Sequence, residues 1–576
     1  MAGSARYTSA DGLSAEAFQG RLFDEAVTVA IKTESLGDGG EITVNVDGRV
    51  SADNLYQWSD QVLLSRAEGS LDYEAIVHVP FGSEHDQVYV IATSDLVGVT
   101  LDVPAPLAKS EAGHARDFVY SQFFAPDSYR VDMSLDDNMH ASLKIVDGIA
   151  VGGRMHFGET TFGAVAYDQI RLTGSLDYLD YEAWMEVTEA LSELTDVSLE
   201  DEIAEHVESA ELEIAELMLF SLPLEQAQVR VTRDESAWVA EVSNDMLAGV
   251  ARVSDSDDVP IQIDLERLRF AEDESADDPL GDVDPIAVGA IDFSTSLLEI
   301  DDENYGSWSF RYRPGEAGAR FEALTADGAG MKVLPNSTLD WTVAAGRHRS
   351  HFTGDIEITD LATTLRQFGF AASMEGDDIQ LQADIVWEGS PAMVDVMSVS
   401  GPVTVEEGKG RFVQAETGGA LKLLGVFDFA SLARRFRLDF SDVLEEGFEF
   451  NNVTGTARFD TGKLSVTEPF RIEGSSGRFT VGGRVDLDSG ELENEMIVTL
   501  PLRRTLPWYA AYSAIATGPL AGAGVMLAQK VFENQIDQMS SAKYRIGGTI
   551  DEPVIEFVAI FDDKVAGVAT EESEQP

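Results

Sequence analysis

Residues 379–388 read Ile-Gln-Leu-Gln-Ala-Asp-Ile-Val-Trp-Glu, and this alternation of apolar and polar side chains decides the fold. Successive side chains of a β-strand point to opposite faces of the sheet, so every second residue lies on the same face. One face then carries the apolar residues Ile379, Leu381, Ala383, Ile385 and Trp387. The stretch predicts a strand with one apolar side and one side in contact with water.

The same alternation recurs along the chain, at residues 42–46, 261–265 and 356–358. Antiparallel sheets produce this pattern, whereas buried parallel sheets produce continuous apolar runs. Gly-containing turns are predicted at Asp47-Gly48 and Thr461-Gly462. We therefore expect a mainly β protein built on a long, twisted antiparallel sheet. Such a sheet must hide its apolar face by closing into a barrel, stacking as a sandwich, or curling into an open groove that something else fills.

Helices interrupt this pattern. Residues 178–219 carry Trp184, Val187, Leu191 and Leu194 near helical spacing, which predicts a helical insertion. It separates a β-segment over residues 1–177 from a second one over residues 220–500, and strands follow at 541–561. Within the second segment we expect short helices near 361–368 and 420–436. The acidic tail, residues 562–576, is expected to be disordered.

An uncharged stretch, residues 505–529, is long enough to span a membrane but is broken by Gly518-Pro519. We interpret residues 501–540 as a hairpin of two short apolar helices. A single transmembrane helix and an ordinary buried helix remain the alternatives. Basic and aromatic side chains flank the stretch, as at a membrane interface. The residues expected to contact a membrane are Arg503, Arg504, Trp508, Tyr509, Tyr512 and Lys530.

The chain is strongly acidic, with a formal net charge of -63 over 576 residues. This charge repels nucleic acid, so no nucleic-acid partner is expected. We interpret the acidity as adaptation to salt. A calcium-binding array is the alternative, but runs such as residues 255–258 lack the spacing of a calcium-binding loop. The chain has no Cys, which excludes disulfides and Cys-ligated metal sites.

Motifs for covalent chemistry are missing from the sequence. It contains no GxSxG elbow, no Walker A loop, no dinucleotide-binding GxGxxG and no HExxH. His348 and His351 are close in sequence and are interpreted as a surface pair. We therefore predict no catalytic, cofactor-binding or metal-binding residues, and we predict that the protein is not an enzyme.

Several blocks of sequence resemble the AsmA-like family, specifically its long YhdP branch, which is related to TamB. The blocks are Ser94-Asp95-Leu96 through Lys109, the strand end Trp387-Glu388-Gly389-Ser390-Pro391, residues 421–448, and residues 500–553 with Tyr544-Arg545-Ile546-Gly547-Gly548. They occur in the family's order and cover most of the chain.

The resemblance implies a sheet curled into a groove with an apolar floor, which bridges the inner and outer membranes and moves phospholipid across the periplasm. It also implies an N-terminal membrane anchor and a long upstream region. No signal peptide is apparent in the first 23 residues, and we expect the chain to be the C-terminal half of such a protein.

We therefore predict a lipid transport protein of the cell envelope, located in the periplasm, that needs no cofactor and binds phospholipid acyl chains. A structural or assembly factor that pairs its sheet edges with outer-membrane proteins is the alternative. The residues expected to line the lipid groove are Ile356, Ile358, Ile379, Leu381, Ile385 and Trp387.

Overall fold

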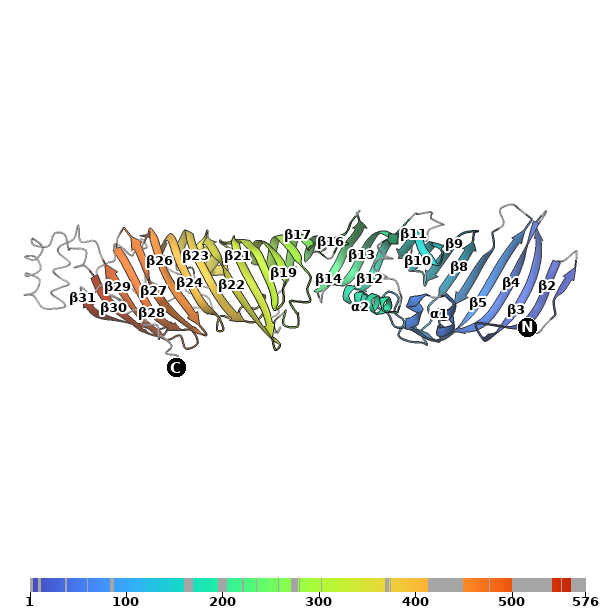
Figure 1. Ribbon diagram of the computed structural model, residues 1–576, viewed down its shortest axis with the longest axis horizontal. Helices are drawn as coiled ribbons and strands as arrows, with labels where there is room; N and C mark the ends of the chain where they lie inside the picture. Colours follow the sequence, from blue (N-terminus) through green and yellow to red (C-terminus); the bar gives the residue numbers. More distant parts are fainter. Residues whose placement is uncertain are drawn as a thin grey trace, which may run out of the picture. The chain divides into compact units, whose positions relative to one another are not determined.

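The computed structural model divides the chain into two compact units, Met1–Asp257 and Asp258–Pro576 (Figure 1). The sequence-based division placed no boundary at this point. The structure describes residues 4–560 except for 9–11, 37–38, 60, 83–86, 160–168, 195–204, 220–221, 235, 257, 271–277, 279, 302, 368–371, 373, 413–448, 476, 500–540 and 551.

The first unit is one open sheet whose strands follow one another mostly in chain order (Figure 1). The strand β7 (Val99–Leu101) stands outside that order, because it pairs with the beginning of β5. The other strands are β1 (Arg6–Thr8), β2 (Gly12–Leu22), β3 (Glu25–Leu36), β4 (Gly39–Ser51), β5 (Ala67–Phe81), β6 (Tyr89–Ser94), β8 (Phe118–Phe124), β9 (Tyr129–Leu135), β10 (Met139–Val146), β11 (Ile149–Phe157), β12 (Ile170–Asp180), β13 (Val207–Leu219), β14 (Leu222–Arg233), β15 (Ala237–Ser243) and β16 (Leu247–Ser254).

The second unit repeats this architecture. The two-residue strand β25 (Glu449–Phe450) pairs with β24, which otherwise pairs with β26. The strands are β17 (Ile261–Phe270), β18 (Ile291–Ile300), β19 (Glu303–Pro314), β20 (Gly318–Gly328), β21 (Met331–Ala344), β22 (Arg347–Ile358), β23 (Met374–Glu388), β24 (Ser400–Phe412), β26 (Asn452–Asp460), β27 (Lys463–Gly474), β28 (Gly477–Asp486), β29 (Leu492–Thr499), β30 (Ser541–Gly548) and β31 (Pro553–Ile560).

The expected fold class, a mainly β protein with a long open sheet, is confirmed. Within the described residues β1 pairs only with β2 and β31 only with β30, so the sheet is not closed. The pairing is mixed, however, and not purely antiparallel. Among the strands that the structure describes, three neighbouring pairs run parallel, namely β11–β12, β12–β13 and β17–β18. Parallel neighbours need a connection that returns across the sheet, and these connections carry the insertions described below.

The alternating stretches all form strands. Residues 42–46 lie in β4, 261–265 in β17, 356–358 in β22 and 379–388 in β23. One of the two predicted turns is wrong, because Gly48 lies inside β4. A Cβ at Gly48 would stand 2.8 Å from Val27 and 2.9 Å from the hydroxyl of Tyr73. This Gly therefore makes room for neighbouring side chains and does not reverse the chain.

The helical expectation for residues 178–219 needs correction. Within the described part of that range the helix α2 covers only Tyr181–Ser192, and residues 207–219 form the strand β13. In β13, Leu212 and Ile214 alternate with Glu211 and Glu213. Pairing with β12 on one side and β14 on the other outweighs the helix propensity of its Glu, Leu and Ala residues.

Other helices flank the sheets. The sequence analysis missed α1 (Ala52–Ser59) and the 3-10 turn η1 (Val62–Arg66), which join β4 to β5. The short helix α4 (Leu361–Gln367) joins β22 to β23. Its first turn is capped by Asp360, whose carboxylate accepts a hydrogen bond from Thr363 N–H at 3.0 Å. The expected helices near 420–436 and 501–540 and the tail 562–576 lie outside the described residues.

The apolar core at the C-terminal end of the second unit predicts a stability difference. Met496 is 1 % exposed and packs with Val481 and Tyr544, whereas Val554 on β31 is 54 % exposed. Met496→Ala leaves a cavity, so we expect it to lower the free energy of unfolding of the second unit by about 2–5 kcal/mol. Val554→Ala should change it by less than about 0.5 kcal/mol. Guanidinium denaturation followed by circular dichroism measures both, and equal effects would contradict this packing.

Candidate functional site

The six residues predicted to line a groove lie on one face of β22 and β23. Ile358 is paired with Ile379 and Ile356 with Leu381 across these strands. Ile385 is paired with Phe352, and Trp387 with Ser350, on the same face. Their burial differs along the strand, because Ile358, Ile379 and Trp387 are buried and the other three are partly exposed. Along β23 buried and partly exposed residues therefore alternate on this face, because Ala383, between Leu381 and Ile385, is buried as well.

An apolar row runs from this point across the neighbouring strands. Its members occupy paired positions, so that each lies beside the next on the same face. In order from β19 to β24 the row consists of Trp308, Ala326, Val333, Ile356, Leu381 and Val405. A second row lies beside it and consists of Tyr312, Phe321, Leu339, Phe352 and Ile385. Side chains from successive strands thus form a continuous apolar floor.

The first unit carries an apolar row without a polar member. All of its residues except Ala141 are partly exposed, so no second layer of the protein buries them fully. The row crosses β2–β6 and β8–β16 in paired positions: Phe18, Val29, Val46, Ala75, Ala92, Tyr120, Met133, Ala141, Met155, Leu172, Ala210, Val231, Ala240 and Ala251. An apolar surface of this length attracts an apolar ligand.

The opposite face of the sheets is charged. Arg320 and Asp340 form an in-register ion pair at 2.6 Å between β20 and β21. The pairs Arg411–Glu375 and Arg484–Glu493 repeat this arrangement further along the second unit. These pairs are exposed and add little to stability. They establish which face is in water.

A segment of the second unit lies over part of its apolar floor. We call Asp278 and residues 280–290 the strap. Three strap residues, Leu280, Val283 and Val288, pack against the buried cluster that contains Tyr312, Trp341 and Trp387. The strap belongs to the connection between the parallel strands β17 and β18, which must return from the end of one strand to the start of the other.

Side chains hold the strap in place. Asp278 accepts hydrogen bonds from the Ser390 amide at 2.7 Å and from its hydroxyl. Tyr312 donates its hydroxyl to Pro285 O at 2.6 Å. Partial burial by itself raises the pKa of Asp278, but the two bonds from Ser390 and the Leu280 amide outweigh it and hold that pKa below its ordinary value. The carboxylate is therefore an ionised anchor at neutral pH.

His348 is a third anchor of the strap, and its interpretation as half of a surface pair is wrong. Trp341 donates its indole N–H to Nδ1 of His348 at 3.0 Å, and Nε2 lies 2.7 Å from Gly281 O. The bond from Trp341 leaves the proton on Nε2, which donates it to Gly281. His351 is on the outer face beside Asp384. Positions 348 and 351 differ by three, and an odd spacing places two strand residues on opposite faces.

Residues 94–109, one of the blocks that resemble the AsmA-like family, form a loop in the first unit that hydrogen bonds hold in place. Lys109 is buried, and its ammonium group donates to Val99 O at 2.7 Å and to Glu111 O at 2.9 Å. A buried cation is tolerated here because backbone carbonyls replace its water. The sequence analysis assigned no role to this Lys.

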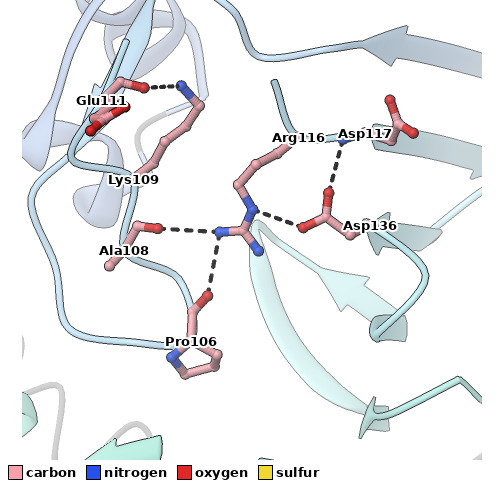
Figure 2. Close-up of polar contacts among 7 residues, drawn as sticks. All are labelled: Pro106, Ala108, Lys109, Glu111, Arg116, Asp117 and Asp136. Atoms are coloured by element: carbon pink, nitrogen blue, oxygen red, sulfur yellow. Dashed lines mark hydrogen bonds and ion pairs between the residues drawn. The ribbon is translucent and has the colours of Figure 1, made fainter. Parts of the chain in front are cut away.

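Arg116 fastens the other side of this loop (Figure 2). Its Nε donates to Asp136 at 2.8 Å, and its Nη1 lies 3.3 Å from both Pro106 O and Ala108 O. The α2 residue Trp184 donates to Ala105 O at 2.8 Å. The loop is thereby joined to both the sheet and the helix that follows β12.

The remaining expectations concern membranes and metals. Arg503, Arg504, Trp508, Tyr509, Tyr512 and Lys530 lie outside the described residues. Of the helices that the structure describes, none is both long enough and apolar enough to cross a bilayer. Within the same residues, no group of three or more His, Cys, Asp or Glu could hold a metal ion.

Comparison with known proteins identifies relatives. The family model described as YhdP protein matches residues 2–555. The intermembrane phospholipid transporter YhdP of Escherichia coli (strain K12) is 27% identical over 235 residues. This match covers 41% of the present chain and 17% of that relative. No solved structure gives a significant match.

The contacts of Lys109 predict a local loss of stability on substitution. Lys109→Met keeps an unbranched side chain but removes the ammonium group that donates to the carbonyls of Val99 and Glu111. We expect the first unit to lose about 2 kcal/mol or more, and residues 95–117 to exchange amide hydrogens faster. The matched control is Lys144→Met, at an exposed position of β10. Equal exchange in the two variants would show that the ammonium group does not hold the loop.

Proposed function

Since this chain belongs to the YhdP family, we propose that it binds phospholipid through the acyl chains and conducts it along the apolar rows of its sheets. We place this activity in the cell envelope, between the inner and outer membranes. The proposal involves no covalent chemistry, and we do not assign an enzymatic activity to the chain.

The observation that carries the proposal is the continuity of the apolar rows. In the first unit the row from Phe18 to Ala251 places an apolar side chain at every step from β2 to β16, apart from β7. A lipid that moves along it exchanges one apolar contact for the next. Each buried methylene group of the acyl chain contributes about 0.8 kcal/mol of binding free energy. Because the number of buried methylene groups stays nearly the same along a uniform row, the binding free energy changes little as the lipid moves.

The charged outer face supports a particular orientation of the bound lipid, with its acyl chains on the apolar face of the sheet. The polar headgroup of a phospholipid favours water, and the acyl chains favour the row. A sheet with one apolar face satisfies both preferences, because a lipid can lie with its acyl chains on the apolar floor and its headgroup in water. The printed name of the relative, an intermembrane phospholipid transporter, fits this arrangement.

The best position for a test is Leu381, which lies between Ile356 and Val405 in the row. It is partly exposed and is not a member of the buried cluster beside it. A charge at this position should therefore disturb bound lipid more than it disturbs folding. Val386 of the same strand points to the opposite face and provides a matched control.

We predict that Leu381→Asp lowers the phospholipid retained by the purified protein at least tenfold, because a carboxylate against acyl chains lacks hydrogen-bond partners. Val386→Asp introduces the same charge on the outer face and should leave the bound lipid unchanged. Mass spectrometry of an organic extract measures the lipid, and circular dichroism checks the fold. A wild-type protein that is folded and free of lipid would contradict the proposed function.

A further inference from the structure

The strap is attached to the second unit in a different way from the strands. Its backbone hydrogen bonds are local turns, such as Val283 N–H to Leu280 O and Ala287 N–H to Asp284 O, except at its last residue, Ala290, whose carbonyl accepts the Ile261 N–H of β17. The anchors to the sheet and its loops described above come from side chains, namely those of Asp278, His348 and Tyr312. Lifting the strap therefore breaks side-chain bonds but leaves the β-ladders intact. Segments held in this way open at a lower free-energy cost than strands.

The strap occupies surface that a lipid chain would use. Leu280, Val283 and Val288 lie on the same floor as Phe310, Phe321 and Ile356, and none of the three is fully buried. The floor beneath includes Trp341, which is 2 % exposed, and Trp387, which is 4 % exposed. If the strap alone lifted, these side chains would meet water. If an acyl chain replaced it, they would stay in an apolar environment, so lipid and strap compete for one surface.

Exposed apolar side chains flank the strap. Ile286 on the strap is 48 % exposed. The loop that receives Asp278, residues 389–399, exposes four more, namely Met393, Val394, Val396 and Met397. Scattered apolar residues on a surface need no explanation, but four within five consecutive positions do.

The loop is well fixed. Ser390 is fully buried, and its carbonyl accepts the indole N–H of Trp387 at 3.0 Å. Asp395 accepts the Met397 amide at 2.9 Å, and its carbonyl accepts the Ser398 amide at 2.9 Å. Exposure of the four apolar side chains is thus a property of the folded loop.

We propose that the strap and the loop 389–399 form a lateral gate through which phospholipid acyl chains enter the groove of the second unit. An acyl chain first contacts the exposed Val394, Val396 and Ile286. It then displaces Leu280, Val283 and Val288 from the floor, while the anchors at Ser390, His348 and Tyr312 release. This inference rests on the proposed function, since it names the entry point for the same ligand.

A disulfide that closes the gate tests the inference. The chain has no Cys, so the pair Asp278→Cys and Ser390→Cys forms the single disulfide that oxidation allows. The two native side chains are in direct hydrogen-bond contact, which brings the new thiols close together. Uptake of a fluorescent phospholipid from phosphatidylethanolamine–phosphatidylglycerol vesicles is then measured in the oxidised and reduced protein.

We expect the oxidised variant to take up lipid at least ten times more slowly than the wild type. The reduced variant lacks the side-chain bonds between Asp278 and Ser390, so it should take up lipid at least as fast as the wild type. A cross-link control carries Arg320→Cys and Asp340→Cys on the outer face of β20 and β21, and its uptake should not depend on oxidation. Uptake by the locked variant at the wild-type rate would overturn the gate alone. A wild-type protein that takes up no lipid would overturn the proposed function as well.

Two further variants keep the test decisive if the cross-link disturbs folding. Tyr312→Phe with Ser390→Ala removes two hydroxyl anchors but keeps the ring and the backbone, so lipid uptake should become faster. Val394→Ser with Val396→Ser makes the exposed surface of the loop 389–399 more polar. Lipid uptake should then become slower, while the amount of lipid retained at equilibrium stays the same. Unchanged rates in both would overturn the gate.

Discussion

The structure depends on one constraint, which is that a β-strand with alternating side chains has an apolar face that must leave water. In a barrel or a sandwich another part of the protein provides the cover. Here every member of the apolar row of the first unit, from Phe18 to Ala251, stays partly exposed except Ala141. A ligand with long apolar chains would cover the row, which is the reason for proposing that the ligand is a lipid.

Parallel pairing accounts for two of the elements that lie beside the sheets. Antiparallel neighbours can be joined by short turns. Where neighbours are parallel, the chain must return across the sheet. The return between β12 and β13 carries α2, and the return between β17 and β18 carries the strap. These two elements follow from the strand order, whereas α1 and α4 lie in connections between antiparallel strands.

Polar groups have two separate tasks in this molecule. On the outer face, pairs such as Arg320–Asp340 are exposed and keep that face in water. Near the apolar side, a few polar groups hold loops in place through hydrogen bonds, such as Lys109 with backbone carbonyls and Asp278 with Ser390. The same chemistry therefore solubilises one face and fastens loops at the other.

The sequence by itself determined the strands, because the alternation of Ile379, Leu381, Ala383 and Ile385 has the period of a pleated strand and no other regular structure. It also determined that Ile356 and Ile358 share one face of their strand, and that the four predicted groove residues of β23 share one face of theirs. The register of β22 against β23 then places both sets on the same side of the sheet. It did not determine the fate of residues 207–219, where local helix propensity competes with pairing partners that are distant in the sequence. Only the tertiary structure placed the strap on the floor, because the contacts of Asp278 with Ser390 and of Gly281 with His348 join residues 112 and 67 positions apart. Such contacts arise from the register of the whole sheet, which no local pattern encodes.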